Sequence, residues 1–212
     1  MHEYHKIQTV YKRDPATKYK TLSIGEYSTP EFEYLANNTW AFTEKVDGTN
    51  IRVYIKEGKI GFGGKTDNAQ IQTHLLTALD ELFTPRQNLL LEIFKDTDVC
   101  LYGEGYGAKI QKGGGLYRQD RGFVLFDIAI GQWWLKRKDM EDIASRLSID
   151  IVPVIGHGTL GEMVDRVREG FDSRWGPFAA EGIVARPLVE LKTRSGERVI
   201  AKLKKKDFAL PG

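Results

Sequence analysis

Short runs of β-branched and aromatic residues, separated by turn-forming pairs that contain glycine, are the feature that most restricts the fold of this chain. Residues 40–44, 50–56 and 59–63 form three such runs, broken at Asp47-Gly48 and Glu57-Gly58. Pairs of this kind between strand-forming runs are typical of antiparallel strands joined by tight turns. We therefore expect these three runs to be successive antiparallel strands.

The remainder of the chain alternates strands with helices. The pattern predicts strands at 99–104 and 122–130, with a turn at Gly131-Gln132, and a closing hairpin over 182–187, 189–193 and 198–204. It predicts helices at 71–83, at 84–94 with Thr84 as N-cap, at 139–147, and from the capping box at Thr159 and Glu162 to about Gly170. Strands outnumber helices, which favours an α+β fold with largely antiparallel sheets flanked by helices.

Composition favours one globular domain over residues 1–212. Apolar residues make up 41% of the chain and charged residues 28%, as in ordinary globular proteins. We find no internal repeat and no long linker. No apolar stretch is long enough to cross a bilayer, and the N-terminus lacks the apolar core of a signal peptide. We therefore expect a cytoplasmic protein with no membrane partner, in the host cytoplasm if a phage encodes it.

The supply of metal ligands is restricted to oxygen. Cys100 is the single cysteine, and the four histidines are scattered, so a Cys/His zinc site is excluded. The net charge of +2 is too small to indicate nucleic-acid binding by itself, because such proteins usually carry a local basic patch. One patch is present near the C-terminus, from Lys202 to Lys206.

The segment Glu44-Lys45-Val46-Asp47-Gly48-Thr49-Asn50 places a lysine between an apolar strand and a sharp turn. A lysine amine is a nucleophile only when neutral, and burial or nearby cations favour that form. The competing interpretation is an ordinary surface hairpin, since Asp-Gly between strands is its commonest signature.

Two further segments carry candidate ligand-binding groups. Glu104 lies among glycines, which allow close approach of a ligand, and its carboxylate could accept a ribose hydroxyl. Phe126 lies in an apolar run and could present its ring to a purine. Taken singly, the Glu104 segment is better interpreted as a glycine-rich turn with a solvated glutamate, and the Phe126 segment is most simply a core strand.

The last two segments are Glu181-Gly182-Ile183-Val184 and Lys202-Leu203-Lys204. Residues two apart in a strand share a face, so Lys202 and Lys204 project together and suit phosphate oxygens. For Lys205 and Lys206 we favour an ordinary basic tail.

In this order, the five segments resemble the motifs of the covalent nucleotidyltransferase superfamily of RNA ligases, DNA ligases and mRNA-capping enzymes. Lys45-Val46-Asp47-Gly48 is similar to its nucleophile motif. Asn50 resembles the RNA ligases related to the second ligase of phage T4, whereas DNA ligases and capping enzymes usually carry arginine there. The resemblance implies the nucleotidyltransferase (ATP-grasp-like ligase) core and an ATP-dependent RNA ligase that seals 5′-phosphate and 3′-hydroxyl ends through lysyl-AMP.

The resemblance also implies residue roles. Lys45 attacks the α-phosphate of ATP, Glu104 binds the ribose, and Phe126 stacks on adenine in a site near Glu44. Glu181 serves a Mg²⁺ site, for which Mn²⁺ is an alternative. Phosphates are contacted by three residues: Asn50, Lys202 and Lys204.

There are two departures from the family pattern. Where relatives supply an arginine, this chain has Lys65, which we take as the substitute, with Arg52 as the weaker candidate. The chain also ends soon after Lys204, so we expect no separate C-terminal domain. We then expect either that residues 4–13 and the basic end bind RNA, or that a protein partner supplies the domain.

The alternatives are a DNA ligase, a capping guanylyltransferase, or a nucleic-acid-binding relative that has lost catalysis. Asn50 argues against the first two. Retention of Lys45 together with the acidic and basic candidates argues against the third, because a binding module needs no reactive amine.

Overall fold

The computed structural model describes residues 3–95 and 97–208. The chain divides into two compact units. We call Met1–Tyr4 with Asp47–Val152 the middle unit, and His5–Val46 with Pro153–Gly212 the flanking unit. The boundary at Val46 and Asp47 falls inside the Lys45-Val46-Asp47-Gly48 motif. That the units together act as one adenylation domain stays a prediction.

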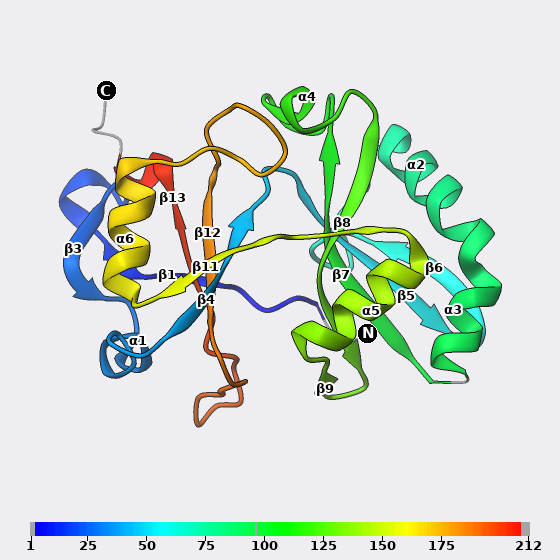
Figure 1. The fold of residues 1–212 in the computed structure, drawn as a ribbon, viewed down its shortest axis with the longest axis horizontal. Helices are drawn as coiled ribbons and strands as arrows, with labels where there is room; N and C mark the ends of the chain where they lie inside the picture. Colours follow the sequence, from blue (N-terminus) through cyan, green and yellow to red (C-terminus); the bar gives the residue numbers. More distant parts are fainter. Residues whose placement is uncertain (1–2, 96, 209–212) are drawn as a thin grey trace. The chain divides into compact units, whose positions relative to one another are not determined.

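The flanking unit is built on a five-stranded sheet (Figure 1). Its order is β1 (Gln8–Thr9), β13 (Ala201–Lys204), β12 (Gly182–Pro187), β4 (Trp40–Lys45) and β11 (Val154–Gly158). Only β1 and β13 pair in parallel; the other neighbours are antiparallel. β12 therefore lies between the strand that ends at Lys45 and the strand that ends at Lys204.

Helix α6 (Leu160–Glu169) packs its apolar side against this sheet. Leu160, Met163, Val164 and Val167 are buried with residues of β4, β12 and β13. The helix begins at the predicted capping box, in which Thr159 and Glu162 bond reciprocally. The unit also contains the small sheet of β2 (Tyr11–Arg13) and β3 (Leu22–Tyr27), the helix α1 (Pro30–Tyr34), and the 3-10 turns η1 (Pro15–Thr17) and η3 (Lys205–Phe208).

The middle unit contains a second sheet of six strands. Its order is β10 (Asp150–Ile151), β8 (Arg121–Ile130), β7 (Val99–Gly107), β5 (Thr49–Lys56) and β6 (Lys59–Gly63), with β9 (Trp133–Trp134) also paired to β8. β10 and β8 are parallel, and the remaining pairs are antiparallel.

Three helices bury their apolar residues with this sheet. They are α2 (Thr73–Phe83), which runs through the 3-10 turn η2 (Thr84–Arg86) into α3 (Gln87–Phe94), and α5 (Arg137–Leu147). The short α4 (Gly114–Tyr117) lies in the loop between β7 and β8. No helix in the described ranges is long and apolar enough to cross a membrane.

The α+β class with largely antiparallel sheets is confirmed, and most predicted elements are present. Three predictions are wrong. β4 and β5 do not pair but belong to different sheets, so Asp47-Gly48 is not a hairpin turn. Residues 189–193 form no strand within the described chain, apart from a single bridge from Lys192 to Arg198. Thr84 is the C-cap of α2, not an N-cap.

Candidate active site

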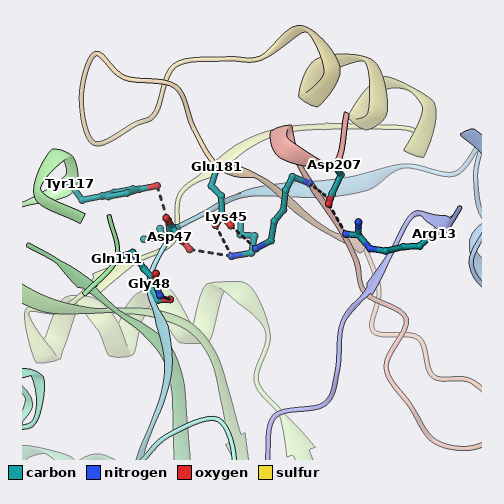
Figure 2. A network of polar contacts seen from close by, with 10 residues as sticks. Arg13, Lys45, Asp47, Gly48, Gln111, Tyr117, Glu181 and Asp207 are labelled. Atoms are coloured by element: carbon teal, nitrogen blue, oxygen red, sulfur yellow. Dashed lines mark hydrogen bonds and ion pairs between the residues drawn. The ribbon is translucent and has the colours of Figure 1, made fainter. Parts of the chain in front are cut away.

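Lys45, Glu181 and Lys204 form one ion-paired cluster in the flanking unit (Figure 2). Lys45 Nζ donates to Glu181 Oε2 at 2.7 Å, and Lys204 Nζ lies 2.7 Å from Glu181 Oε1. Their side chains are 19%, 12% and 23% exposed for Lys45, Glu181 and Lys204 respectively. One partly buried carboxylate is thus shared by two lysines, of which one is the predicted nucleophile.

Strand register explains why these three side chains meet. Gly182 pairs with Lys45 of β4 on one side and with Lys204 of β13 on the other. Glu181 precedes Gly182, so its side chain leaves the end of the central strand between the two lysines. A Cβ on Gly182 would lie 2.1 Å from the Leu203 carbonyl oxygen, so this position requires glycine.

The alternation predicted for the last strand is confirmed. In β13, Ala201 and Leu203 are buried while Lys202 and Lys204 are partly exposed, so the two lysines share a face. Lys45 on β4 and Lys204 on β13 reach the same carboxylate. The cluster therefore presents cationic amines around one acid, which is suited to a polyphosphate.

Glu44 is 1% exposed and holds the segment that follows α6. Its Oε1 accepts a hydrogen bond from Ser173 Oγ at 2.6 Å, and its Oε2 accepts one from the Arg174 backbone N–H at 2.8 Å. The carboxylate is thus engaged inside the protein. Its hydrogen bonds hold loop 173–174 in place. A part for Glu44 in the purine site stays a prediction.

In the middle unit, the Asp47-Gly48 turn packs closely on β7. A Cβ on Gly48 would lie 2.3 Å from the Gly105 carbonyl oxygen and 2.7 Å from Glu104 Cγ. Its φ is not positive, so the glycine is required by close approach rather than by a left-handed backbone. Two side chains of the loop between β7 and β8 also hold the turn: Tyr117 Oη accepts from the Asp47 N–H at 3.3 Å, and Gln111 Nε2 donates to the Gly48 carbonyl at 3.0 Å (Figure 2).

The base of that loop is fixed by Tyr106. Its hydroxyl donates to Asp150 Oδ2 at 2.7 Å, and the Arg118 guanidinium lies over its ring at 5.5 Å. Burial, followed by the hydrogen bond to Asp150, raises the pKa of Tyr106 to about 12. The phenol therefore remains a neutral donor at physiological pH and keeps the loop anchored.

Asn50 and Glu104 are register partners on β5 and β7. Asn50 Oδ1 is buried and has no hydrogen-bond partner among the described residues. Because buried polar atoms are normally paired, this oxygen has capacity for a ligand. The structure thus brings these two predicted residues together, while their roles toward phosphate and ribose stay predictions.

Phe126 occupies a β-bulge in β8. The register shifts here: Tyr102 lies opposite Asp127 and Gly103 opposite Leu125, with Phe126 between them. Leu125 and Asp127 are fully buried, whereas Phe126 is half-buried. A bulge of this kind redirects a side chain and is frequent beside active sites.

The Tyr4 ring stabilises this position. It meets Phe126 edge-on at 5.0 Å between centroids and also contacts Tyr102 at 5.1 Å, while its hydroxyl donates to Asp127 Oδ2 at 2.7 Å. The predicted adenine-stacking residue is thus supported by an N-terminal aromatic side chain.

Lys65 is exposed in the loop after β6, and Arg52 holds that loop. Arg52 is 4% exposed, its Nε donates to the Gly64 carbonyl at 2.8 Å, and its Nη1 pairs with Asp67 at 2.8 Å. Arg52 is therefore committed inside the unit, which leaves Lys65 as the better substitute for the family arginine.

The described residues contain no group of three or more His, Cys, Asp or Glu side chains placed to hold a metal ion. Glu181 offers a carboxylate beside Lys45. Magnesium commonly keeps several waters and takes one or two carboxylates together with substrate phosphates. The donor set therefore fits a Mg²⁺ or Mn²⁺ ion that arrives with a nucleotide, and the part of Glu181 in holding that ion stays a prediction.

The predicted nucleic-acid contacts of the N-terminal segment differ in exposure and pairing. Of its predicted nucleic-acid contacts, Tyr11 is buried and Arg13 pairs with Asp207 at 2.6 Å. Lys6 and Lys12 are exposed. Lys12 lies 3.9 Å from Glu26, and an RNA contact through this segment stays a prediction.

Sequence reasoning missed the supporting roles of six residues: Tyr4, Arg13, Gln111, Tyr117, Ser173 and Asp207. None of them belongs to a repeated spacing. The signals that the sequence offered were chemical, since Asp207 directly follows a basic run and Tyr117 lies two residues after a triple glycine.

Comparison with known proteins adds a family and a fold. A family model described as RNA ligase matches residues 38–204. No curated protein sequence matches the chain. Among solved structures, the RNA ligase of Naegleria gruberi with pyrophosphate is 18% identical, with a TM-score of 0.65 over 97% of this chain and 60% of that chain.

Two variants of the same Naegleria gruberi enzyme are also similar. One, solved with AMP and manganese, is 18% identical with a TM-score of 0.63 over 95% of this chain and 56% of that one. The other, solved with ATP and manganese, is 21% identical with a TM-score of 0.60 over 81% and 52%. At these identities the likeness shows the fold, and the chain spans little more than half the length of these structures.

Proposed function

The chain belongs to the RNA ligase family, and from that premise we propose that it is an ATP-dependent RNA ligase in which Lys45 becomes covalently attached to AMP. The observation that carries the proposal is the Lys45–Glu181–Lys204 cluster. The proposed nucleophile lies there beside an acid and a second amine, at the ends of neighbouring strands. The Naegleria structures with ATP, AMP and pyrophosphate are consistent with this nucleotide chemistry.

In the first step, the neutral Lys45 amine attacks the α-phosphorus of ATP. A phosphorus–nitrogen bond forms, the bond from the α-phosphorus to the bridging oxygen breaks, and pyrophosphate leaves. In the ion pair with Glu181 the amine carries its proton, which must depart before attack. Lys204 and Lys202 would offset the charge that develops on the phosphate oxygens.

A divalent cation held with Glu181 would supply further neutralisation of those oxygens. Within the middle unit, Phe126 would stack on adenine and the Glu104 carboxylate would accept a hydrogen bond from a ribose hydroxyl. Asn50 and Lys65 complete the proposed nucleotide contacts.

In the second step, an oxygen of an RNA 5′-phosphate attacks the lysyl-AMP phosphorus, and the Lys45 amine leaves. In the third step, a 3′-hydroxyl attacks the phosphorus of the adenylated end, a phosphodiester bond forms, and AMP leaves. RNA is therefore the proposed substrate. We propose in addition that a partner protein or a further segment contributes to holding the two ends.

Intact mass after incubation with ATP and Mg²⁺ tests the first step. The expected result is one added AMP, and Lys45→Arg provides a control, because arginine keeps a positive charge but cannot act as the nucleophile. An unchanged mass for the natural sequence would reject the enzyme in favour of the inactive binding relative. Equal labelling by GTP would favour a capping-type enzyme.

Sealing of a pre-adenylated RNA end, compared with a matched DNA end, tests the substrate. Because phosphate contacts release counterions, sealing should fall more steeply with salt than adenylation does. Preference for DNA ends would instead support a DNA ligase. Sealing that appears only after a second protein is added would show that this chain acts as a catalytic subunit.

A further inference from the structure

Asp207, in the turn η3 after β13, is a buried carboxylate that the chemistry described above does not use. It is 3% exposed. Its Oδ1 accepts a hydrogen bond from Arg13 Nη2 at 2.6 Å, and its Oδ2 accepts one from the Lys204 backbone N–H at 3.0 Å. A buried charge is costly unless it is paired and hydrogen-bonded, and Arg13 meets that need from 194 residues away.

The contacts of Asp207 lead directly to the candidate active site. Figure 2 shows Arg13 and Asp207 in the same polar network as Glu181 and Lys45. Asp207 fixes the main chain of Lys204, while the next residue, Lys205, donates its N–H to the Glu181 carbonyl at 2.9 Å. The Lys204 ammonium then reaches the Glu181 carboxylate at 2.7 Å.

Arg13 is itself well placed to restrain this segment. It ends β2 in the two-stranded sheet with β3, and its Nη1 donates to the Lys20 carbonyl at 3.2 Å. Its side chain is 35% exposed, whereas Asp207 is buried. Loss of Arg13 would therefore leave the buried Asp207 carboxylate without its cation, next to the main chain of Lys204.

We propose that Arg13 and Asp207 are positioning residues for Lys204, which they hold at Glu181 and, in the nucleotide complex, at the phosphates of ATP. This inference rests on the proposed function. Neither residue touches nucleotide in the proposal; both act through the main chain of Lys204. The alternative is that the pair only stabilises the fold, and the two cases differ in how they affect adenylation once Lys204 has been removed.

The experiment measures adenylation rate against ATP concentration for the natural sequence, Asp207→Asn and Arg13→Lys. Glu190→Gln is the matched control, because Glu190 pairs with the buried Arg198 in the same unit. We expect Asp207→Asn to lower the rate at limiting ATP by about 10- to 100-fold, the size typical when a group that orients a functional side chain is lost. Arg13→Lys, which keeps the charge, should show a smaller loss, and Glu190→Gln should lose stability alone.

The deciding measurement repeats Asp207→Asn in a Lys204→Ala background. If Asp207 acts through Lys204, its further effect should be no more than about two-fold, because coupled residues are not additive. A full additional loss in that background, or an effect of Asp207→Asn equal to that of Glu190→Gln, would overturn the proposal. Arg13→Lys decides the same question if Asp207→Asn does not fold. Absence of an AMP adduct on the natural sequence, read first, would instead reject the proposed function.

Discussion

In the flanking unit, the side chains of Lys45 and Lys204 meet at a third candidate, Glu181, whereas in the middle unit the side chain of Phe126 is held by a residue outside the proposed chemistry. Lys45 and Lys204 share the Glu181 carboxylate. Phe126, by contrast, is supported by the Tyr4 ring, and Gly48 by the backbone of β7. The predicted roles do not follow this difference, since Asn50 in the middle unit is a predicted phosphate contact and Glu44 in the flanking unit belongs to the predicted purine site.

This difference determines how substitutions should combine. A change in the flanking cluster alters the partners of the remaining members, so effects there should be coupled. A change in the middle unit removes one contact and leaves the others in place. Each prediction below tests one side of this contrast, or shows where it ceases to hold.

The largest effect is expected from Lys45→Ala, which should abolish adenylation because it removes the attacking amine. Lys204 still pairs with Glu181 in this variant, so the buried acid is not left without a cation. Label transfer from ATP measures the loss, and the unfolding temperature is the control for folding. An AMP adduct that persists on the alanine variant would show that another residue is the nucleophile.

Gly48→Ala should follow, with about a 100-fold loss of adenylation, although it removes no chemical group. The new methyl would collide with the Gly105 carbonyl and Glu104, so the turn after the proposed nucleophile has to shift. Displacement of reacting groups by about 1 Å can cost a factor of this size.

Rates of AMP attachment measure the loss in Gly48→Ala, with Gly58→Ala as control. Gly58 has open space for a methyl but a positive φ, so strain there should cost stability and not chemistry. Equal rates for both variants would contradict the close-approach argument.

Gly48 also shows where sequence reasoning reached its limit. The Asp47-Gly48 pair predicted a hairpin, and the short runs around it were correctly predicted as strands. Alternation shows which residues share a face, as it did for Lys202 and Lys204, but it does not identify the neighbouring strand. β4 and β5 therefore separated into two sheets without any local signal in the sequence.

The supporting contacts were unpredictable for a related reason. Asp207 meets Arg13 across 194 residues, and Tyr4 meets Asp127 across 123. Such pairs have no periodic spacing, because they depend on how complete elements pack. The candidate site could be predicted from the sequence because its residue types follow the order of the family motifs. The residues that hold those side chains could not, because their contacts depend on packing in each unit.

Phe126→Ala should weaken nucleotide binding by about 1–3 kcal/mol, the usual contribution of one stacked base. Since Phe126 lies in a bulge, the strand pairing on either side should remain. Calorimetric titration with ATP measures the change. Independence of the two units can be checked by combining Phe126→Ala with Lys204→Ala, for which additive losses are expected; strong coupling would contradict the contrast drawn above.

The smallest effect is expected from Thr159→Ala at the start of α6, a change in the flanking unit that touches none of the candidate residues. The Thr159 hydroxyl accepts from the Glu162 N–H at 3.2 Å, and Glu162 Oε2 accepts from the Thr159 N–H at 2.7 Å. Loss of an N-cap costs about 1 kcal/mol of stability.

The hydrogen bond from the Thr159 backbone N–H, followed by that from its hydroxyl, lowers the pKa of Glu162. A carboxyl whose pKa is lower in the folded state adds stability above its unfolded pKa and loses it as the pH falls through the folded value. The difference in unfolding free energy between Thr159→Ala and the natural sequence should therefore shrink in acid, while AMP attachment at neutral pH stays unchanged. Denaturant titrations at neutral and acid pH measure the first quantity. A loss of adenylation in this variant would mean that stability and chemistry are not separable within the flanking unit, and that the coupling inferred for Lys45, Glu181 and Lys204 extends through the helix.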